Sequence, residues 1–150
     1  MTVHAVPVLE PQATDDAIAY ADAFEVRTPE PDDRTAERWI RAGLEASAVI
    51  RKTVVAVHRA VLRFRLDPTP APDRALGWRI VTSEHDLVRL EADGPLMHGV
   101  LVGHRTDPRS MRLTTTLVFH RPAARAVWVV VGPLHRRIAP YLLARAARAG

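Results

Sequence analysis

The sequence predicts a single α+β domain in which helices pack on a curved antiparallel sheet of about six strands. The 150 residues are 47% hydrophobic and 25% charged, which is enough for one core and too apolar for a disordered chain. After one short strand, hydrophobic residues recur with a helical period up to Gly77 and then with a period of two. The remaining strands therefore form a separate run, which is typical of an α+β fold.

The N-terminal part of the chain is expected to hold an arm and one strand. Residues 1–19 contain Pro7 and Pro11 among small and acidic side chains, so we expect a flexible N-terminal arm. Residues 20–150 are expected to form the domain. Its first strand is expected over residues 23–27.

Two helices are expected after this strand. The first begins near Asp32 or Asp33, because either carboxylate can cap a helix N-terminus. Its apolar face has helical spacing and comprises Ala36, Trp39, Ile40, Gly43 and Leu44. The second helix is expected from Ser47 toward Leu66. Its apolar stripe comprises Ile50, Val54, Val57, Val61 and Phe64. The valines lower its helix propensity, but the stretch is too long for an ordinary strand.

Alternating hydrophobic residues predict a run of strands after Gly77. The expected strands cover residues 78–83, 87–92, 96–105, 111–120 and 125–131. Gly132 and Pro133 then open a long final helix that continues to about Ala149. Pro140 lies inside this helix and should kink it, because proline lacks the N–H for one backbone hydrogen bond. A helix of this length across a concave sheet often leaves a cavity between the two.

Composition excludes several classes of function. The chain has no cysteine, which excludes disulfides, thiol catalysis and cysteine-ligated metal centres. It contains no phosphate-binding glycine loop, dinucleotide fingerprint or serine-hydrolase elbow. We expect no cofactor and no metal. Neither a signal peptide nor a membrane-spanning stretch is visible, so a cytoplasmic protein is expected.

The net charge of +4 hides an uneven distribution along the chain. Residues 1–50 carry ten acidic and four basic side chains, whereas residues 51–150 carry seven acidic and 17 basic ones. The basic side chains are dispersed and lack neighbouring stacking aromatics, so nucleic acid is not the expected partner. We expect the basic surface to border the cavity, which makes an anionic ligand an option. Peripheral membrane contact is an alternative, and both a monomer and a homodimer stay open.

Two stretches of the sequence resemble a known family. The first, Tyr20-Ala21-Asp22-Ala23-Phe24, leads into the first strand and is followed by Trp39 in the first helix. The second, Pro133-Leu134-His135-Arg136-Arg137-Ile138-Ala139-Pro140, lies in the last helix with Leu143 behind it. Together with the order of elements, they resemble a mainly bacterial family of SRPBCC-type domains in the START-like, helix-grip superfamily. This superfamily includes polyketide cyclases and lipid-transfer domains.

The resemblance covers roughly residues 20–149 and implies a helix-grip fold. It implies a hydrophobic cavity that holds a lipid, a polyketide or another small apolar or amphipathic molecule. It implies no established activity. Members of the superfamily often have seven strands, whereas six are counted in this sequence.

Four residues are candidates for lining a ligand site: Thr115, Trp128, His135 and Ile138. His135 lies in the first turn of the expected final helix, where an imidazole could orient a ligand or act as a general acid–base group. A structural hydrogen bond is the alternative role. Thr115 would place one polar hydroxyl on an otherwise apolar strand face, where it could orient a ligand. Trp128 would line the floor of the cavity. His98 and His104 lie roughly 20 Å apart at strand rise, too far to share one metal ion.

The leading hypothesis is a binding module for a small, largely apolar molecule. An enzyme of the cyclase, dehydratase or isomerase type that uses His135 is the second hypothesis. The third is a structural or interaction protein whose own side chains fill the cavity. A cavity of several hundred Å³ would favour the first two.

Overall fold

The fold is built on one open antiparallel sheet. The structure is a computed structural model that describes residues 2–9, 17–45, 47–67 and 69–150. The strands are β1 (Val3–Ala5), β2 (Tyr20–Arg27), β3 (Arg74–Ala75), β4 (Trp78–Ser83), β5 (Leu87–Asp93), β6 (Met97–Asp107) and β7 (Ser110–Phe119). The described helices are α1 (Ala36–Leu44), α2 (Ala48–Ala56) with the π-helical turn η2 (Val57–Val61), and α3 (Pro122–Arg148). The α+β class is confirmed.

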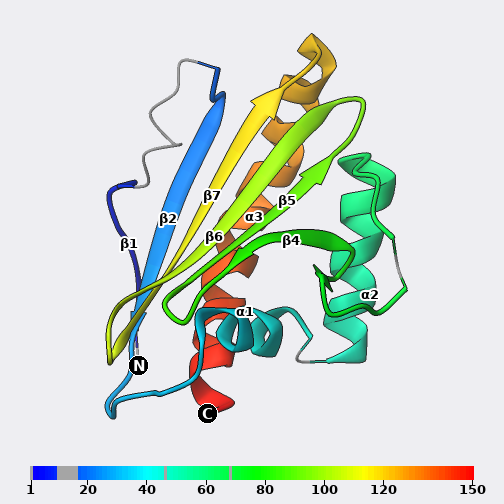
Figure 1. Cartoon of the computed structure of the whole chain (residues 1–150). Coiled ribbons are helices and arrows are strands. Elements are labelled where there is room, and N and C mark those ends of the chain that lie inside the picture. The colour runs from blue at the N-terminus through cyan, green and yellow to red at the C-terminus, as the bar shows by residue number, and fades with distance from the viewer. Residues whose placement is uncertain (1, 10–16, 46, 68) are drawn as a thin grey trace.

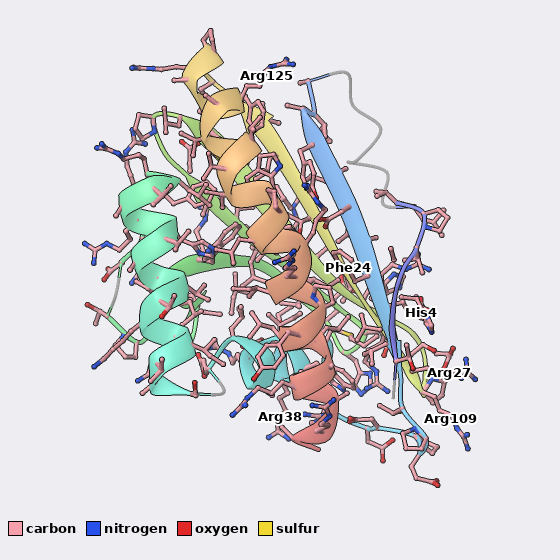
Figure 2. All side chains as sticks on the ribbon, turned by 180° about the vertical axis from the view of Figure 1, so that it is seen from behind. His4, Phe24, Arg27, Arg38, Arg109 and Arg125 are labelled. Atoms are coloured by element: carbon pink, nitrogen blue, oxygen red, sulfur yellow. The ribbon has the colours of Figure 1, made fainter. Side chains whose placement is uncertain are left out.

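The seven strands are ordered β1-β2-β7-β6-β5-β4-β3, and all neighbouring pairs are antiparallel. The long helix α3 runs behind the sheet in Figure 1. From the opposite side, in Figure 2, α3 passes in front of the strands with α2 beside it. Strands β2 and β7 pair in a register that places Asp22 opposite Thr115, so these two side chains share a face of the sheet.

The face of the sheet beneath the helices carries the core. Along β5 the buried residues alternate with partly buried ones, as expected for a strand with one face packed on helices. In β6, a Cβ on Gly99 would lie 2.9 Å from the Trp78 ring and 3.0 Å from the Phe64 ring. The absence of a side chain at Gly99 therefore allows these two aromatic rings to pack directly on the strand.

Helix α1 has the buried face that the sequence predicts, but a different cap. Thr35 is the N-cap residue, and its hydroxyl accepts a hydrogen bond of 3.2 Å from the backbone N–H of Arg38. The prediction of Asp32 or Asp33 as the cap was wrong. The Asp32 carboxylate instead accepts a hydrogen bond from the backbone N–H of Arg34, and the two side chains form an ion pair.

Helix α2 begins as predicted, with Ser47 accepting a hydrogen bond from the backbone N–H of Ile50. It does not continue to Leu66. The chain leaves the helix after η2, and Arg63 adopts a left-handed conformation with φ of 62°. The backbone N–H of Arg65 then donates to Asp93, so a sheet contact replaces the next helical turn. Val54 is the one buried residue of α2 itself.

The strand predicted over residues 125–131 was wrong, because this segment is the N-terminal part of α3. A run of β-branched valines mimics a strand there. The buried side chains, however, keep helical spacing through Ala124, Trp128 and Val131 and onward to Ala139. Burial of this continuous face against the sheet outweighs the lower helix propensity of the valines.

The sheet has seven strands rather than about six. Five of the predicted strands are present, and β1 and β3 are additional. Strand β1 lies within the segment expected as a flexible arm and pairs with β2 through Val3, His4 and Ala5. Residues 10–16 of that arm lie outside the described residues.

Candidate functional site

A cavity of about 130 Å³ lies between the helices and the sheet, which is smaller than the several hundred Å³ expected for a ligand-binding or catalytic cavity. Side chains of α1, α2, η2 and α3 form one side of it, and side chains of β4, β6 and β7 form the other. Among the described residues that line it, none is Asp, Glu, Lys or Arg. The lining is therefore apolar apart from a few neutral polar groups, which is the usual composition of a small-molecule site.

All four candidate residues from the sequence line this cavity: Thr115, Trp128, His135 and Ile138. Trp128 reaches it from α3 rather than from a strand, and it is 8% exposed. Thr115 reaches it from β7 and is 4% exposed. The structure brings the four side chains to one place, and their role toward a ligand stays a prediction.

His135 is held by a carboxylate on the sheet. Its Nε2 lies 3.0 Å from Oδ2 of Asp22, and both side chains are largely buried. The Tyr20 hydroxyl donates a second hydrogen bond of 2.5 Å to the same carboxylate oxygen. Arg136 in turn donates to the Tyr20 oxygen at 3.4 Å. The predicted structural hydrogen bond of His135 is thus present, and it connects α3 to β2 at the cavity wall.

Aromatic rings surround this hydrogen-bonded group. The ring centroids of Tyr20 and Trp128 are 4.8 Å apart, and those of Trp128 and His135 are 5.3 Å apart. Burial, and then the hydrogen bond to Asp22, raises the pKa of Tyr20 to about 12. Tyr20 therefore remains a hydrogen-bond donor at neutral pH, which keeps the carboxylate in its acceptor role.

A second histidine, which the sequence analysis missed, lines the same cavity. His58 lies in η2, and its Nδ1 accepts a hydrogen bond of 3.1 Å from Nε1 of Trp78. Because an indole N–H can only donate, Nδ1 carries no proton, and the neutral ring is protonated at Nε2. Burial, and then the positive charge of His135 when protonated, lowers the pKa of His58 to about 4. His58 is thus a neutral hydrogen-bond donor at neutral pH.

Four polar atoms near the cavity have no hydrogen-bond partner among the described residues: Thr115 Oγ1, Trp128 Nε1, Trp39 Nε1 and Asp22 Oδ1. A buried polar group without a partner costs about 1–3 kcal/mol, so each such group needs a reason. Three of them belong to side chains that line the cavity. Trp128 and Asp22 both lie beside His135, with the Trp128 ring centroid 5.3 Å from that of His135 and the Asp22 carboxylate in hydrogen-bond contact with it.

The other histidines lie away from the cavity. His98 and His120 both contact Oδ1 of Asp93, at 3.3 and 3.0 Å. The hydrogen bond from His120 is the largest influence on the pKa of Asp93, which is lowered. No group of three or more side chains that could hold a metal ion is present among the described residues.

Basic side chains of α2 and η2 border a separate surface groove. Arg51, Lys52 and Arg59 line that groove together with Leu76 at the tip of the β3–β4 turn. No arginine or lysine among the described residues lines the cavity of about 130 Å³. The expected link between the basic surface and the cavity therefore has no support in the lining residues.

Comparison with known proteins adds no family assignment. No family model matches the sequence, and no curated protein matches it significantly. None of the helices in the described parts of the chain is both long and apolar enough to cross a membrane. The two stretches that carry the START-like resemblance do meet in space, because Asp22 of the first contacts His135 of the second.

Proposed function

We propose that this protein is a START-like, helix-grip domain that binds a small, largely apolar molecule between α3 and the sheet. The observation that carries the proposal is the apolar cavity of about 130 Å³ with four neutral polar side chains, Thr53, His58, Thr115 and His135, in its lining. The order of elements supports the helix-grip assignment: one long strand, two helices, a run of antiparallel strands and a long final helix. The seven-stranded sheet is consistent with it.

The cavity volume favours a compact ligand. A dry apolar cavity of about 150 Å³ accepts benzene, so a volume of about 130 Å³ suits a molecule with roughly one ring. A longer acyl or polyketide chain needs more room than this. Movement of α2 would make more room, and α2 has fewer buried residues than α1 or α3, since Val54 is its one buried residue.

The polar groups favour a ligand that carries a hydrogen-bond acceptor. The Nε2–H of His58 and the hydroxyl of Thr115 are donors that lack a partner among the described residues. A neutral carbonyl or ether oxygen would satisfy either donor without the cost of burying a charge. An anionic ligand is disfavoured, because no arginine or lysine among the described residues lines the cavity to balance its charge.

The test is direct binding of small ring compounds. Toluene and cyclohexanone are added to the ¹⁵N-labelled protein, and amide shifts are followed by NMR. Native mass spectrometry of freshly purified protein reports any molecule that is already bound. We expect saturable shifts at residues of α3, η2 and β7. If neither probe binds and no molecule co-purifies, the proposed function is overturned.

A cavity-filling substitution provides the matched control. Ala139 lines the cavity and is 6% exposed, so Ala139→Leu should occupy part of its volume and weaken binding of both probes by at least tenfold. Ala126 lies on the same helix, is exposed and is outside the cavity lining. Ala126→Leu should therefore bind as the wild type does. Equal binding by both variants would place the ligand elsewhere.

A further inference from the structure

The two histidines of the cavity are held in complementary hydrogen-bonding states. The contact from Trp78 to Nδ1 of His58 leaves the proton of the neutral ring on Nε2, as a donor. At His135, Nε2 faces a carboxylate oxygen of Asp22, which only accepts, so Nε2 carries the proton. The neutral ring of His135 then has its lone pair on Nδ1, which makes no hydrogen bond to the described residues.

The cavity therefore offers a ligand one base, the lone pair on Nδ1 of His135, and one hydrogen-bond donor, Nε2–H of His58. Both rings line the cavity, and they are close enough for the charge of one to influence the other. A histidine oriented by a carboxylate is a common general base, because the carboxylate fixes the tautomer and stabilises the protonated ring. A neutral imidazole that donates from its N–H can polarise a carbonyl oxygen.

We propose that the cavity catalyses proton transfer at the carbon next to a carbonyl group of a compact ring compound, with His135 as the base and His58 as the donor to the carbonyl oxygen. This inference rests on the proposed function, because it requires a ligand in the same cavity. It goes further by naming a reaction and a substrate class, a small enolisable ketone.

The step balances without any further reactant. Nδ1 of His135 takes the proton from the carbon, and the C–H electron pair becomes the new C=C bond. The π pair of the C=O bond moves to oxygen, where Nε2–H of His58 donates a hydrogen bond to the enolate. His135 then returns the proton. When the proton on Nδ1 is first replaced by a deuteron from D₂O, return to the same carbon gives the exchanged ketone. Return to the far carbon of a conjugated enolate gives an isomer.

Four ionisable groups lie around His135. Asp22 contacts its ring directly, Tyr20 donates a hydrogen bond to Asp22, and Arg136 donates one to Tyr20. The fourth group is His58, which interacts with His135 through charge across the cavity. Asp22 is a positioning residue, since it orients the ring and does not reach the substrate. The surrounding apolar walls lower the local dielectric constant, which strengthens the hydrogen bond from His58 to a developing oxyanion.

The test is hydrogen–deuterium exchange of cyclohexanone in D₂O, followed by NMR of the ketone, with binding measured on the same samples. The wild type should exchange the α-hydrogens faster than free imidazole at equal concentration. His135→Gln should lose at least a hundredfold of this rate, because a general base contributes about 10²–10⁴-fold. His58→Gln keeps an acceptor for Trp78 and should lose less. Both variants should still bind cyclohexanone.

The control is a histidine in a similar contact outside the cavity. Nδ1 of His85 lies 2.7 Å from Asp86 on an exposed turn, so His85→Gln should exchange as the wild type does. Asp22→Asn should lower the rate and change its pH profile while cyclohexanone still binds. If a histidine variant fails to fold, the wild-type rate relative to free imidazole still decides the matter.

The outcomes separate this inference from the proposed function. Binding of cyclohexanone without faster exchange overturns the catalytic inference and leaves the binding proposal intact. Full activity in His135→Gln also overturns it. Absence of any probe binding overturns both proposals.

Discussion

The indole Nε1 of Trp78 donates a hydrogen bond of 3.1 Å to Nδ1 of His58, across two segments twenty residues apart in the chain. Their rings also meet edge to face, with centroids 5.6 Å apart. Protonation of Nδ1 would place two N–H groups against each other in the core. The fold therefore favours the neutral ring of His58, and this lowers the stability of the protein in acid.

We expect the protein to lose stability as the pH falls from 6.5 toward 4. In the unfolded chain His58 takes up a proton near pH 6.5, whereas its folded pKa is lowered to about 4, chiefly by burial. Between these values the unfolded state binds more protons, so acid favours unfolding. The contribution of His58 between pH 7 and pH 5 is about 2 kcal/mol. Urea unfolding at both pH values measures it.

The matched variant is His58→Gln, which has no proton to gain in this range. Its loss of stability between pH 7 and pH 5 should be smaller than that of the wild type by about the same 2 kcal/mol. His85→Gln, on an exposed turn, should leave the wild-type difference unchanged. Identical pH dependence in the wild type and His58→Gln would contradict the assignment of a low pKa to His58.

The sequence could predict one half of the candidate site and not the other. His135 was found because it stands close to Pro133, where the final helix was expected to begin. That helix begins at Pro122, so the placement of His135 in its first turn was wrong. Its partner Asp22 is 113 residues away, and no local pattern indicates such a contact. His58 was missed because the residues around it in the chain show only the apolar stripe of a helix, and this pattern does not single out a histidine. The left-handed turn at Arg63 brings Phe64 beside Trp78, and no motif marks that turn.

Helices and strands were predictable where the spacing of hydrophobic residues follows a single period along the whole element. Strand β5 alternates cleanly, and helix α1 keeps a helical spacing, so both were found. The N-terminal part of α3 fits two periods at once, because residues 127–131 are all apolar and rich in valine. Helical spacing from Ala124 to Ala139 was the deciding signal, and it becomes visible only across the whole helix.

Thr115→Val should stabilise the protein and weaken ligand binding. The Thr115 hydroxyl is buried without a hydrogen-bond partner among the described residues, so its removal at constant shape avoids a cost of about 1 kcal/mol. The same hydroxyl is a proposed anchor for a ligand oxygen. Urea unfolding and cyclohexanone titration measure the two effects. Thr116→Val, on the opposite face of β7, should leave cyclohexanone affinity unchanged. A destabilised Thr115→Val would contradict the premise that its hydroxyl is unsatisfied.

Ultraviolet titration should show a tyrosine that ionises near pH 12. The chain has two tyrosines, and burial together with the hydrogen bond to Asp22 raises the pKa of Tyr20 to about 12. Tyr20→Phe should remove this late transition. Above pH 10 the unfolded chain loses the tyrosine proton while the folded protein keeps it, so stability should fall as the pH rises from 10 to 12. Tyr141→Phe should leave the late transition in place, and its loss in that variant would contradict the assignment.

Arg34 should be the strongest single polar link between α1 and the C-terminal end of α3. Its Nη2 donates to Asp32 Oδ2 at 2.6 Å and to the carbonyl oxygen of Ala146 at 2.9 Å, and its guanidinium lies 4.7 Å from the centre of the Trp39 ring. Hydrogen bonds from a charged group contribute about 1.5–3 kcal/mol, so Arg34→Ala should lower the free energy of unfolding by about that amount.

Arg38 is the matched control for Arg34. It lies on the exposed side of α1, and Arg38→Ala should change the free energy of unfolding by less than about 0.5 kcal/mol. Urea unfolding of both variants decides the comparison, and equal losses would contradict the special role of Arg34. The cavity is lined by both α1 and α3, so loss of their link should also loosen the site. Cyclohexanone affinity should therefore fall in Arg34→Ala and stay unchanged in Arg38→Ala.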